Sequence, residues 1–560
     1  MTRNTELHFS QTPQINIKRS KFERSCSHKT SFNAGDMIPV YWEDVLPGDT
    51  VQMDMAELVR MATPIYPIMD NMYMDIMFFF VPNRLIYDHW AEFWGENDDP
   101  WTQQTAYEIP TITPPSGGWT EGTIADYLGV PTKVDLYKKP IALPFRAYCK
   151  IWNDYMRDEN LKSAAHIYTD DTNRTGLNGT EVGYNYVTGA ELGGAPLKMA
   201  KFHDYFTSAL PDLQKGPAVT IPLGTSAKIK TTAQINTEAM SEGLRWQYLD
   251  GSMVGGTGSA NVANVAIHPG SSASGYGYRT TTAGTITDNN EPPIAPSNLI
   301  ADLSDATAAT INQLRTAFAI QKYYEAAGRN GTRLIEMIRS VFGVTSSDAR
   351  LQRAEYLGGT RVPLNIDQIL QTSSTDATSP QGNTAGFSCT INRDSLFTKS
   401  FEEHGILMGI ICVRTDHTYQ QGLEKKFTRT KWTQYYNPYF ANLSEEAIEV
   451  GEIYADGTAT EADAFGYQER WADYRYGINR VSGYMRSNAT GSLDVWHFAD
   501  DYASQPYLSS EWIDEPVTNV DRTIAVTSQL THQYIGDFFF KTYWTRPMPV
   551  YSVPGLIDHV

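Results

Sequence analysis

Three apolar segments that lie far apart in the chain limit the folds open to this sequence. Residues Ile68–Val81 start with alternating apolar and polar side chains and end in a continuous apolar run, Gly405–Val413 is apolar throughout, and Asp537–Trp544 contains three consecutive phenylalanines. Alternation that passes into a continuous apolar run is typical of a strand entering a buried sheet. The longest run has nine residues, about half of what a bilayer span needs. We therefore predict buried strands.

Helical spacing is limited to four blocks, in which apolar residues recur at intervals of three or four. These blocks are Ile86, Trp90 and Phe93 before Gly95; Phe145, Tyr148, Trp152 and Tyr155 after Pro144; Ile311, Leu314 and Phe318 between Ser304 and Gly328; and Leu334, Ile338 and Phe342 between Thr332 and Gly343. Because they do not alternate with strands, a doubly wound α/β domain is excluded. Strands at both ends, with one more predicted at Leu493–Phe498, favour a sandwich whose first and last strands pair.

The composition is that of an ordinary globular chain with unusually many aromatic and few charged residues. Of 560 residues, 41% are hydrophobic, 12% are aromatic, with 33 Tyr and 12 Trp, and only 19% are charged, against about 25% in typical domains. Aromatic rings suit strands and supply contact area at interfaces. A chain that hides much of its surface against copies of itself has this composition, and so does a secreted lectin.

Cysteine usage and the first residues indicate a reducing, cytosol-like compartment. The four cysteines, Cys26, Cys149, Cys389 and Cys412, are far apart and form no CxxC pair, so reduced thiols are expected rather than a disulfide scaffold or a zinc site. The first residues lack the apolar core of a secretory signal.

Residues 1–36 are polar without sustained periodicity, and we interpret them as an extended basic arm. Residues 1–29 have a local charge of +4 although the whole chain has −19. Phosphate contact by such an arm is sequence-independent and salt-sensitive, whereas pairing with acids of a neighbouring subunit would make it a clasp. Both roles remain open for the basic residues Arg3, Lys18, Arg19, Lys21, Arg24 and Lys29.

The segment 251–300 differs from the rest in composition. It holds 8 Gly, 6 Ser and 6 Thr, and its only charged residues are Arg279, Asp288 and Glu291. Such a composition indicates loops and short exposed strands, so we predict a surface insertion in a core that resumes afterwards. Tyr276 and Tyr278, beside small polar residues, are candidates for receptor attachment; an inert exposed loop is the alternative.

Motifs for enzyme chemistry are scarce. No Gly-Lys pair of a phosphate-binding loop, no HExxH and no GxSxG motif occurs. Gly255–Gly258 lacks the third glycine of a dinucleotide fingerprint. Asp154 and Glu159 lie near Trp152, but proximity in sequence fixes neither the carboxyl separation nor the sugar cleft that a glycosidase needs. We predict that the chain is not an enzyme.

Two acidic clusters admit a metal site as the alternative to a solvated surface. Glu402, Glu403 and His404 precede an apolar run and are expected at a solvated strand entry. The second cluster is a longer run of carboxylates without a basic residue, and it is expected to be a solvated loop. The alternative is a divalent cation bound between subunits, because carboxylate ligands suit calcium or magnesium. The run consists of Glu445, Glu446, Glu449, Glu452, Asp456, Glu461 and Asp463. No resident metal or cofactor is predicted.

Several blocks in order resemble the major capsid proteins of gokushoviruses, a branch of the microviruses. These blocks are Phe78–Trp90 (FFFVPNRLIYDHW), Phe202–Gly224, and Ala319–Gly359 with Gln321–Ile335 (QKYYEAAGRNGTRLI) and Ala354–Gly359 (AEYLGG). The resemblance extends over nearly the whole chain except about 225–300.

The resemblance implies a mainly β fold: an eight-stranded viral jelly roll, which is an antiparallel β-sandwich, with long loop insertions and a few helices. It also implies a T=1 icosahedral shell around a circular single-stranded DNA genome, with a small basic packaging protein inside. The variable insertion would form protrusions near the three-fold axes.

The sequence is therefore divided into a basic arm (1–36), a jelly-roll core (37–224 and 304–560) and a surface insertion (225–303). The expected function is self-assembly into a bacteriophage virion in the host cytoplasm. Expected partners are other copies of the chain, single-stranded DNA, the packaging protein and a host receptor, which a glycan would suit, and no membrane. The alternative is a carbohydrate-binding jelly roll or a phage receptor-binding module.

Overall fold

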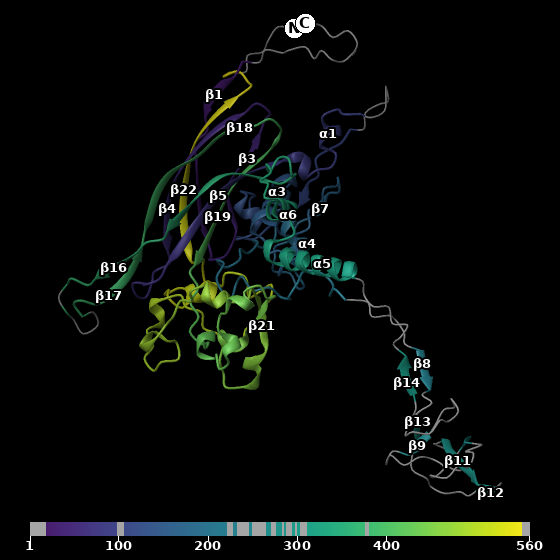
Figure 1. Cartoon of the computed structure of the whole chain (residues 1–560). Coiled ribbons are helices and arrows are strands. Elements are labelled where there is room, and N and C mark those ends of the chain that lie inside the picture. The colour runs from purple at the N-terminus through teal and green to yellow at the C-terminus, as the bar shows by residue number, and fades with distance from the viewer. Residues whose placement is uncertain are drawn as a thin grey trace. The chain divides into compact units, whose positions relative to one another are not determined.

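The computed structural model describes residues 18–97, 106–220, 311–373, 375 and 380–551 in full. Within 221–310 it describes the backbone of seven short strands. The chain divides into two compact units, Met1–Lys215 with Glu325–Val560, and Gly216–Tyr324. Each unit is described by itself below (Figure 1).

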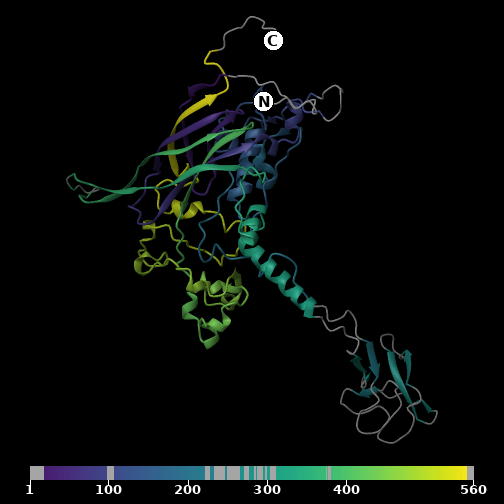
Figure 2. The same cartoon turned by 45° about the horizontal axis from the view of Figure 1, so that its top comes forward.

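Two antiparallel sheets form the centre of the first unit (Figures 1 and 2). One has the order β1-β22-β4-β18, with β2 also on β22, and the other has the order β15-β5-β19-β3. Their bounds are β1 Ser20–Glu23, β2 Cys26–Phe32, β4 Thr50–Met61, β18 Thr390–Ser400 and β22 Tyr534–Arg546; and β3 Ile38–Val45, β5 Met72–Pro82, β15 Glu355–Pro363 and β19 Gly405–Thr415. Since β1 and β2 follow one edge of β22, the sandwich has eight strand positions, which confirms the predicted jelly roll.

The first and last strands of the structure pair across the sequence, but the first strands are β1 and β2, in residues predicted to be an arm, and not the predicted strand at Ile68–Val81, which is β5 of the other sheet. Ser20 lies opposite Arg546 and Phe32 lies opposite Tyr534, so β1 and β2 together follow β22 along its whole length. On its other side β22 pairs with β4 from Tyr534 to Thr545. Strand β22 is thus a central strand, although it comes from the C-terminal end of the chain.

Strands β5 and β19 are apolar on both faces because each face is covered. Phe78 and Leu407 point into the core between the two sheets. Phe79 and Met408 point the other way, into a second core formed with helix α3 (Leu143–Ile151). Coverage on both faces explains why these strands read as continuous apolar runs. Gly409 lies so close to Phe78 that a Cβ there would be 2.6 Å from the ring.

The second core belongs to the segment between β5 and β15. Its elements are α1 Trp90–Phe93, α2 Ile124–Tyr127, α3, α4 Tyr186–Gly189, and the short parallel pair β6 Ile112–Thr113 and β7 Arg174–Thr175. The predicted helix at Phe145–Tyr155 is α3 with the π-helical turn Trp152–Met156. Helix α5 spans Ile311–Asn330 and runs two residues past the predicted end at Gly328. Helix α6, Leu334–Phe342, ends at Gly343 as predicted, and Gly343 is in the left-handed conformation. The residue that caps its N-terminus is Arg333 rather than Thr332.

Residues 416–533, between β19 and β22, form an excursion that we call the 416–533 segment. It contains β20 Glu446–Glu449, β21 Ala464–Gln468, α7 Val517–Asp521 and several 3-10 turns. Ile448 and Phe465 of this segment pack in one apolar cluster with Phe206, which comes from an earlier part of the chain. The predicted strand at Leu493–Phe498 is wrong: a 3-10 turn occupies Asp494–Trp496, where the Ser492 hydroxyl accepts a hydrogen bond from the Asp494 amide.

The remaining strands form small sheets. The hairpin of β16 (Ile366–Leu370) and β17 (Thr384–Ser388) projects beyond the two main sheets in both views (Figures 1 and 2). The second unit contains the strands β8 Lys228–Thr231, β9 Trp246–Tyr248, β10 Val265–Pro269, β11 Tyr276–Thr282, β12 Thr285–Ile286, β13 Ile294–Pro296 and β14 Leu299–Asp302. They form antiparallel sheets in which β11 lies between β10 and β12, β9 pairs with β13, and β8 pairs with β14. Among the described residues no helix is long and apolar enough to cross a membrane.

Candidate functional site

Two of the basic residues predicted to form an arm lie in strands. Lys21 belongs to β1 and Lys29 to β2, and Arg24 joins the two strands. The Arg24 guanidinium forms an ion pair with Glu43 at 2.8 Å, and Lys29 forms one with Asp537 at 3.2 Å. Two of the candidate residues therefore have acidic partners within their own chain.

Other members of the predicted set have different surroundings. The Arg19 guanidinium donates to Thr50 Oγ1 at 2.8 Å and to the Gly48 carbonyl. Lys18 and Lys21 are exposed, and neither forms an ion pair within the described part of the chain. Arg3 lies outside the described residues.

Alternation along the strands gives the five-stranded sheet an outer face that carries polar side chains together with the exposed Ile391 and Ile535. On β22 the even-numbered side chains from Tyr534 to Trp544 are buried in the sandwich, while the odd-numbered ones face outward. The same alternation occurs on β4 and at the start of β18. We define the outer sheet face by its basic and aromatic side chains: Lys21, Lys29, Arg60, Arg393, Phe539, Lys541 and Tyr543.

Strand register sets the neighbours of these side chains. Phe539 lies opposite Ala56 on one side and Ser27 on the other, and Ala56 in turn lies opposite Arg393. Small residues thus flank Phe539, whose side chain is 46% exposed. Farther along β22, the ammonium groups of Lys21 and Lys541 lie 4.1 Å and 5.7 Å from the centre of the Tyr543 ring.

A second exposed surface lies on the 416–533 segment. It is carried by short 3-10 turns at Trp432–Gln434, Pro438–Phe440 and Ala472–Tyr474. We define this aromatic surface by five exposed side chains: Trp432, Tyr435, Tyr436, Tyr439 and Tyr474. Trp432 is 71% exposed and Tyr439 is 94% exposed, so most of both side chains meets solvent.

Packing beneath the aromatic surface holds it in place. Trp471 Nε1 donates to the Phe440 carbonyl at 3.1 Å, and its ring lies 5.7 Å from that of Tyr436. The Arg429 guanidinium forms an ion pair with Asp473 and lies 4.3 Å from the centre of the Tyr474 ring. The surface is therefore built on fixed turns rather than on loose side chains.

The basic residues around the aromatic surface are mostly neutralised. Glu424 forms ion pairs with Lys426 at 2.6 Å and with Arg480 at 2.5 Å. Lys425 pairs with Glu446 at 3.2 Å. The surface is consequently rich in rings and guanidinium groups but carries little unpaired charge.

Helix α6 exposes a further apolar stripe. Leu334, Val341 and Phe342 recur at helical spacing and are each more than half exposed. No side chain of α6 is buried. A helix with an uncovered apolar face is typical of one that packs on a partner.

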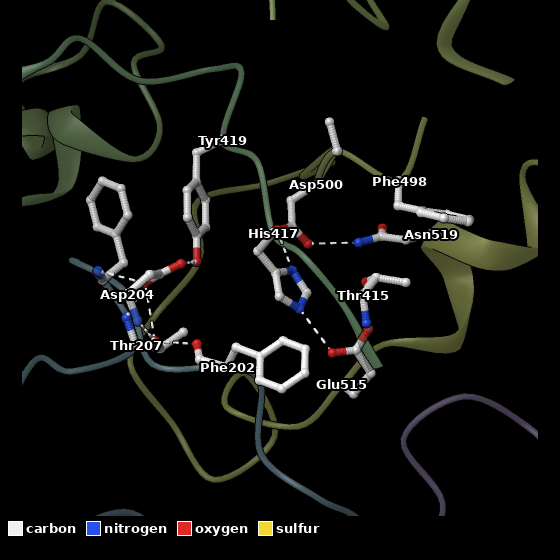
Figure 3. A network of polar contacts seen from close by, with 12 residues as sticks. Phe202, Asp204, Thr207, Thr415, His417, Tyr419, Phe498, Asp500, Glu515 and Asn519 are labelled. Carbon is white, nitrogen blue, oxygen red and sulfur yellow. Dashed lines mark hydrogen bonds and ion pairs between the residues drawn. The ribbon is translucent and has the colours of Figure 1, made fainter. Parts of the chain in front are cut away.

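A buried polar network ties the two ends of the 416–533 segment together (Figure 3). His417 lies just after β19, and its ring nitrogens contact Asp500 at 2.8 Å and Glu515 at 2.9 Å. Glu515 also accepts from the amide and hydroxyl of Thr415, and Asn519 donates to Asp500 at 2.9 Å. The three charged groups thus fix the residues that follow β19 against residues near α7.

Electrostatics keep His417 protonated. Burial alone would lower the pKa of His417, but the two carboxylates outweigh the effect of burial and raise this pKa to about 10. The positive charges of His417 and Lys201 lower the pKa of Asp500. Because both ring nitrogens are occupied by carboxylates, His417 has no free lone pair to act as a general base, and its role in the described structure is to hold the fold.

Most of the acidic candidates outside the run 445–463 have structural partners, whereas Glu402 is exposed. Glu403 pairs with Arg84 at 2.7 Å, and His404 stacks on Trp94, with burial lowering the His404 pKa. Asp154 pairs with Lys150 at 2.9 Å, and Glu159 pairs with Lys215 at 3.3 Å.

Within the run 445–463, two carboxylates are buried. Glu445 pairs with Arg329, and Glu452 accepts from the Tyr205 hydroxyl at 2.9 Å; burial raises the pKa of both. No group of three or more His, Cys, Asp or Glu able to hold a metal ion occurs in the part of the chain that the structure describes.

The attachment candidates lie in the second unit. Tyr276 and Tyr278 are both in β11. Their side chains lie outside the described part of the structure.

Sequence reasoning missed the aromatic surface and the His417 network. The signal for the first was present in the stretch 424–440 (EKKFTRTKWTQYYNPYF), where aromatic and basic residues alternate closely. The network had no local signal, because Asp500 and Glu515 are 83 and 98 residues away from His417.

Comparison with known proteins gives one consistent result. Residues 10–556 match the family model of a phage capsid protein, the F protein. The chain is similar to the capsid protein VP1 of Spiroplasma virus 4 (42% identity), Bdellovibrio phage phiMH2K (41%) and Chlamydia phage 1 (38%). Each alignment covers at least 98% of this chain and 97% of the relative.

Proposed function

Because the chain belongs to the capsid protein (F protein) family of the gokushovirus type, we propose that it assembles into a T=1 icosahedral shell around a circular single-stranded DNA genome. The capsid identity places the protein in the virion. Assembly in the cytoplasm of a bacterial host and a small basic packaging protein belong to the same proposal.

The aromatic surface is the observation that supports self-assembly most directly. Trp432 and Tyr439 expose most of their side chains, which is costly for a protein that remains a monomer in water. Tyr, Trp and Arg are the residues enriched at the centres of protein interfaces. The rigid turns below also reduce the entropy lost when such side chains bind.

Three further parts of the chain have distinct roles in this proposal. The stripe on α6 supplies a second apolar contact, and a closed shell needs each subunit to contact several neighbours. The insertion 225–303 between core segments 37–224 and 304–560 serves as a surface protrusion for host attachment, with Tyr276 and Tyr278 as contact residues for a receptor or glycan. Residues 1–36, with Arg3, Lys18, Arg19, Lys21, Arg24 and Lys29, face the genome or a neighbouring subunit.

Electron microscopy and sedimentation of the purified protein test the assembly proposal. We expect uniform small icosahedral particles from the wild-type chain. The double variant Trp432→Ser, Tyr439→Ser should lose most of its particles while keeping a monomer that unfolds like the wild type.

Tyr137→Ser is the matched control, because Tyr137 is 98% exposed and lies outside the aromatic surface. This variant should assemble normally. Monomeric wild-type protein under all conditions would overturn the shell proposal. Normal particles from the double variant would instead overturn the role of the aromatic surface.

A further inference from the structure

We propose that the outer sheet face binds single-stranded DNA, with a base stacked on Phe539 and phosphates held by Lys21, Arg393 and Lys541. This inference rests on the proposed enclosure of the genome, and it moves the contact from a flexible arm to one face of the sandwich.

The setting of Phe539 suits a stacking platform. Its ring stands on a central strand with Ala56 and Ser27 as its neighbours across the sheet. Adjacent strands are about 4.8 Å apart, so small residues on both sides leave room for a planar base beside the ring. Base stacking on an aromatic side chain tolerates any base, as packing of a whole genome requires.

Tyr543 has a different role from Phe539, because two lysine ammonium groups already contact its ring. Lys21 from β1 and Lys541 from β22 both approach it, at 4.1 Å and 5.7 Å from the ring centre. Attraction between an ammonium group and the ring face restrains the long lysine side chains without neutralising them. The two positive charges are therefore gathered at one place and remain able to bind phosphate.

Charge distinguishes this face from the rest of an acidic protein. Five outward basic residues, Lys21, Lys29, Arg60, Arg393 and Lys541, are accompanied by the outward acids Glu23, Asp54 and Asp537. Of the five bases, only Lys29 forms an ion pair within the described structure. The chain as a whole has a net charge of −19, so unpaired cations on one flat face make a local site for a polyanion.

Single-stranded DNA suits these features better than a duplex or a second copy. A base can stack on Phe539 only when it is not already stacked inside a helix. A contact between copies would be expected to neutralise its charges as the aromatic surface does, whereas four of the five cations here form no ion pair within the described structure. A second copy on this face is therefore an outcome for the test to detect.

Fluorescence anisotropy with a labelled oligothymidylate of 20 nucleotides tests the inference on the full-length unassembled protein. Phe539→Ser should weaken binding about tenfold, as expected from the loss of one stacked base. Arg393→Ser with Lys541→Ser should weaken binding and lower the slope of log affinity against log salt by about 1.4, because two phosphate contacts with a single strand are lost.

Phe427→Ser and Lys426→Ser are the matched controls, since both residues are exposed and lie on the 416–533 segment. They should bind the oligonucleotide like the wild type. Thermal unfolding of each variant checks the fold, and the ratio of absorbance at 260 and 280 nm of purified particles measures their DNA content. The Phe539 and the Arg393, Lys541 variants should give particles with less DNA.

The outcomes separate this inference from the shell proposal. Oligonucleotide binding that is unchanged in the outer-face variants overturns the sheet-face site, even if particles form. Unchanged binding together with lost particles assigns the face to contact between copies instead. Absence of wild-type particles overturns the shell proposal alone, because the binding measurement uses the unassembled chain.

Discussion

The outer sheet face and the aromatic surface both expose rings next to basic side chains, but they differ in whether those basic side chains form ion pairs. Around Trp432 and Tyr435, carboxylates such as Glu424 and Asp473 neutralise the nearby cations. On the sheet, Lys21 and Lys541 lie against an aromatic ring and form no ion pair within the described residues. Exposed aromatic residues alone therefore do not identify a partner; the pairing of the charges around them separates a protein contact from a nucleic-acid contact.

The two surfaces also differ in how the chain supports them. Hydrogen bonds between β22 and its neighbours fix the outer sheet face along its whole length. The aromatic surface stands on turns within the 416–533 segment, whose two ends are joined by the buried network at His417. Weakening that network should consequently affect one surface and spare the other.

The largest effect is expected from His417→Gln. The substitution leaves Asp500 and Glu515 facing each other without the cation between them, and breaking a buried ion pair in this way costs about 3–5 kcal/mol. We expect a free energy of unfolding lowered by about that amount in denaturant titrations. Particle formation should fall sharply while oligonucleotide binding is retained.

His203→Gln is the control for this variant, because His203 is exposed and should tolerate the change. Equal loss of assembly and of oligonucleotide binding in His417→Gln would contradict independent support of the two surfaces.

A smaller change in the free energy of unfolding is expected when the pH is raised. The pKa of His417 is raised from 6.5 to about 10 in the folded protein, so the stability from its charge is fully present below about pH 6.5 and is lost as the pH rises through about 10. The difference in unfolding free energy between wild type and His417→Gln should therefore shrink between pH 7 and pH 11. Denaturant titrations across this range measure it, and a constant difference would count against a charged His417.

Much of the sandwich could be predicted because burial leaves a local trace in the sequence. The continuous apolar runs in β5 and β19 exist because both faces are covered, and the alternation in β22 exists because only one face is. The interpretation of residues 18–32 as part of an arm missed β1 and β2, because an edge strand with a polar outer face contains few apolar residues. Pairing with β22, more than 500 residues away in the chain, creates these strands.

The candidate site was less accessible to sequence reasoning. The basic residues of the N-terminal region were recognised, but their partners on the sheet, Arg393 and Lys541, come from other strands and meet them only through the register. Similarly, Leu493–Phe498 alternates like a strand, yet Trp496 stacks on Tyr66 in a turn at 5.2 Å. Patterns along the chain report on local burial, whereas sites depend on which distant segments are brought together.

The smallest expected effect tests the role of charge pairing itself. Glu424 neutralises Lys426 and Arg480 beside the aromatic surface, so Glu424→Gln should free both cations next to exposed rings. If unpaired charge is what makes such a surface bind nucleic acid, the affinity of the unassembled variant for the oligothymidylate should rise about two- to fivefold at low salt and return to the wild-type value as salt screens the charges. Glu402→Gln changes the net charge equally at an exposed residue that belongs to neither surface and should leave the affinity unchanged. An equal rise in the two variants would show that net charge, and not the local pairing, separates the two surfaces.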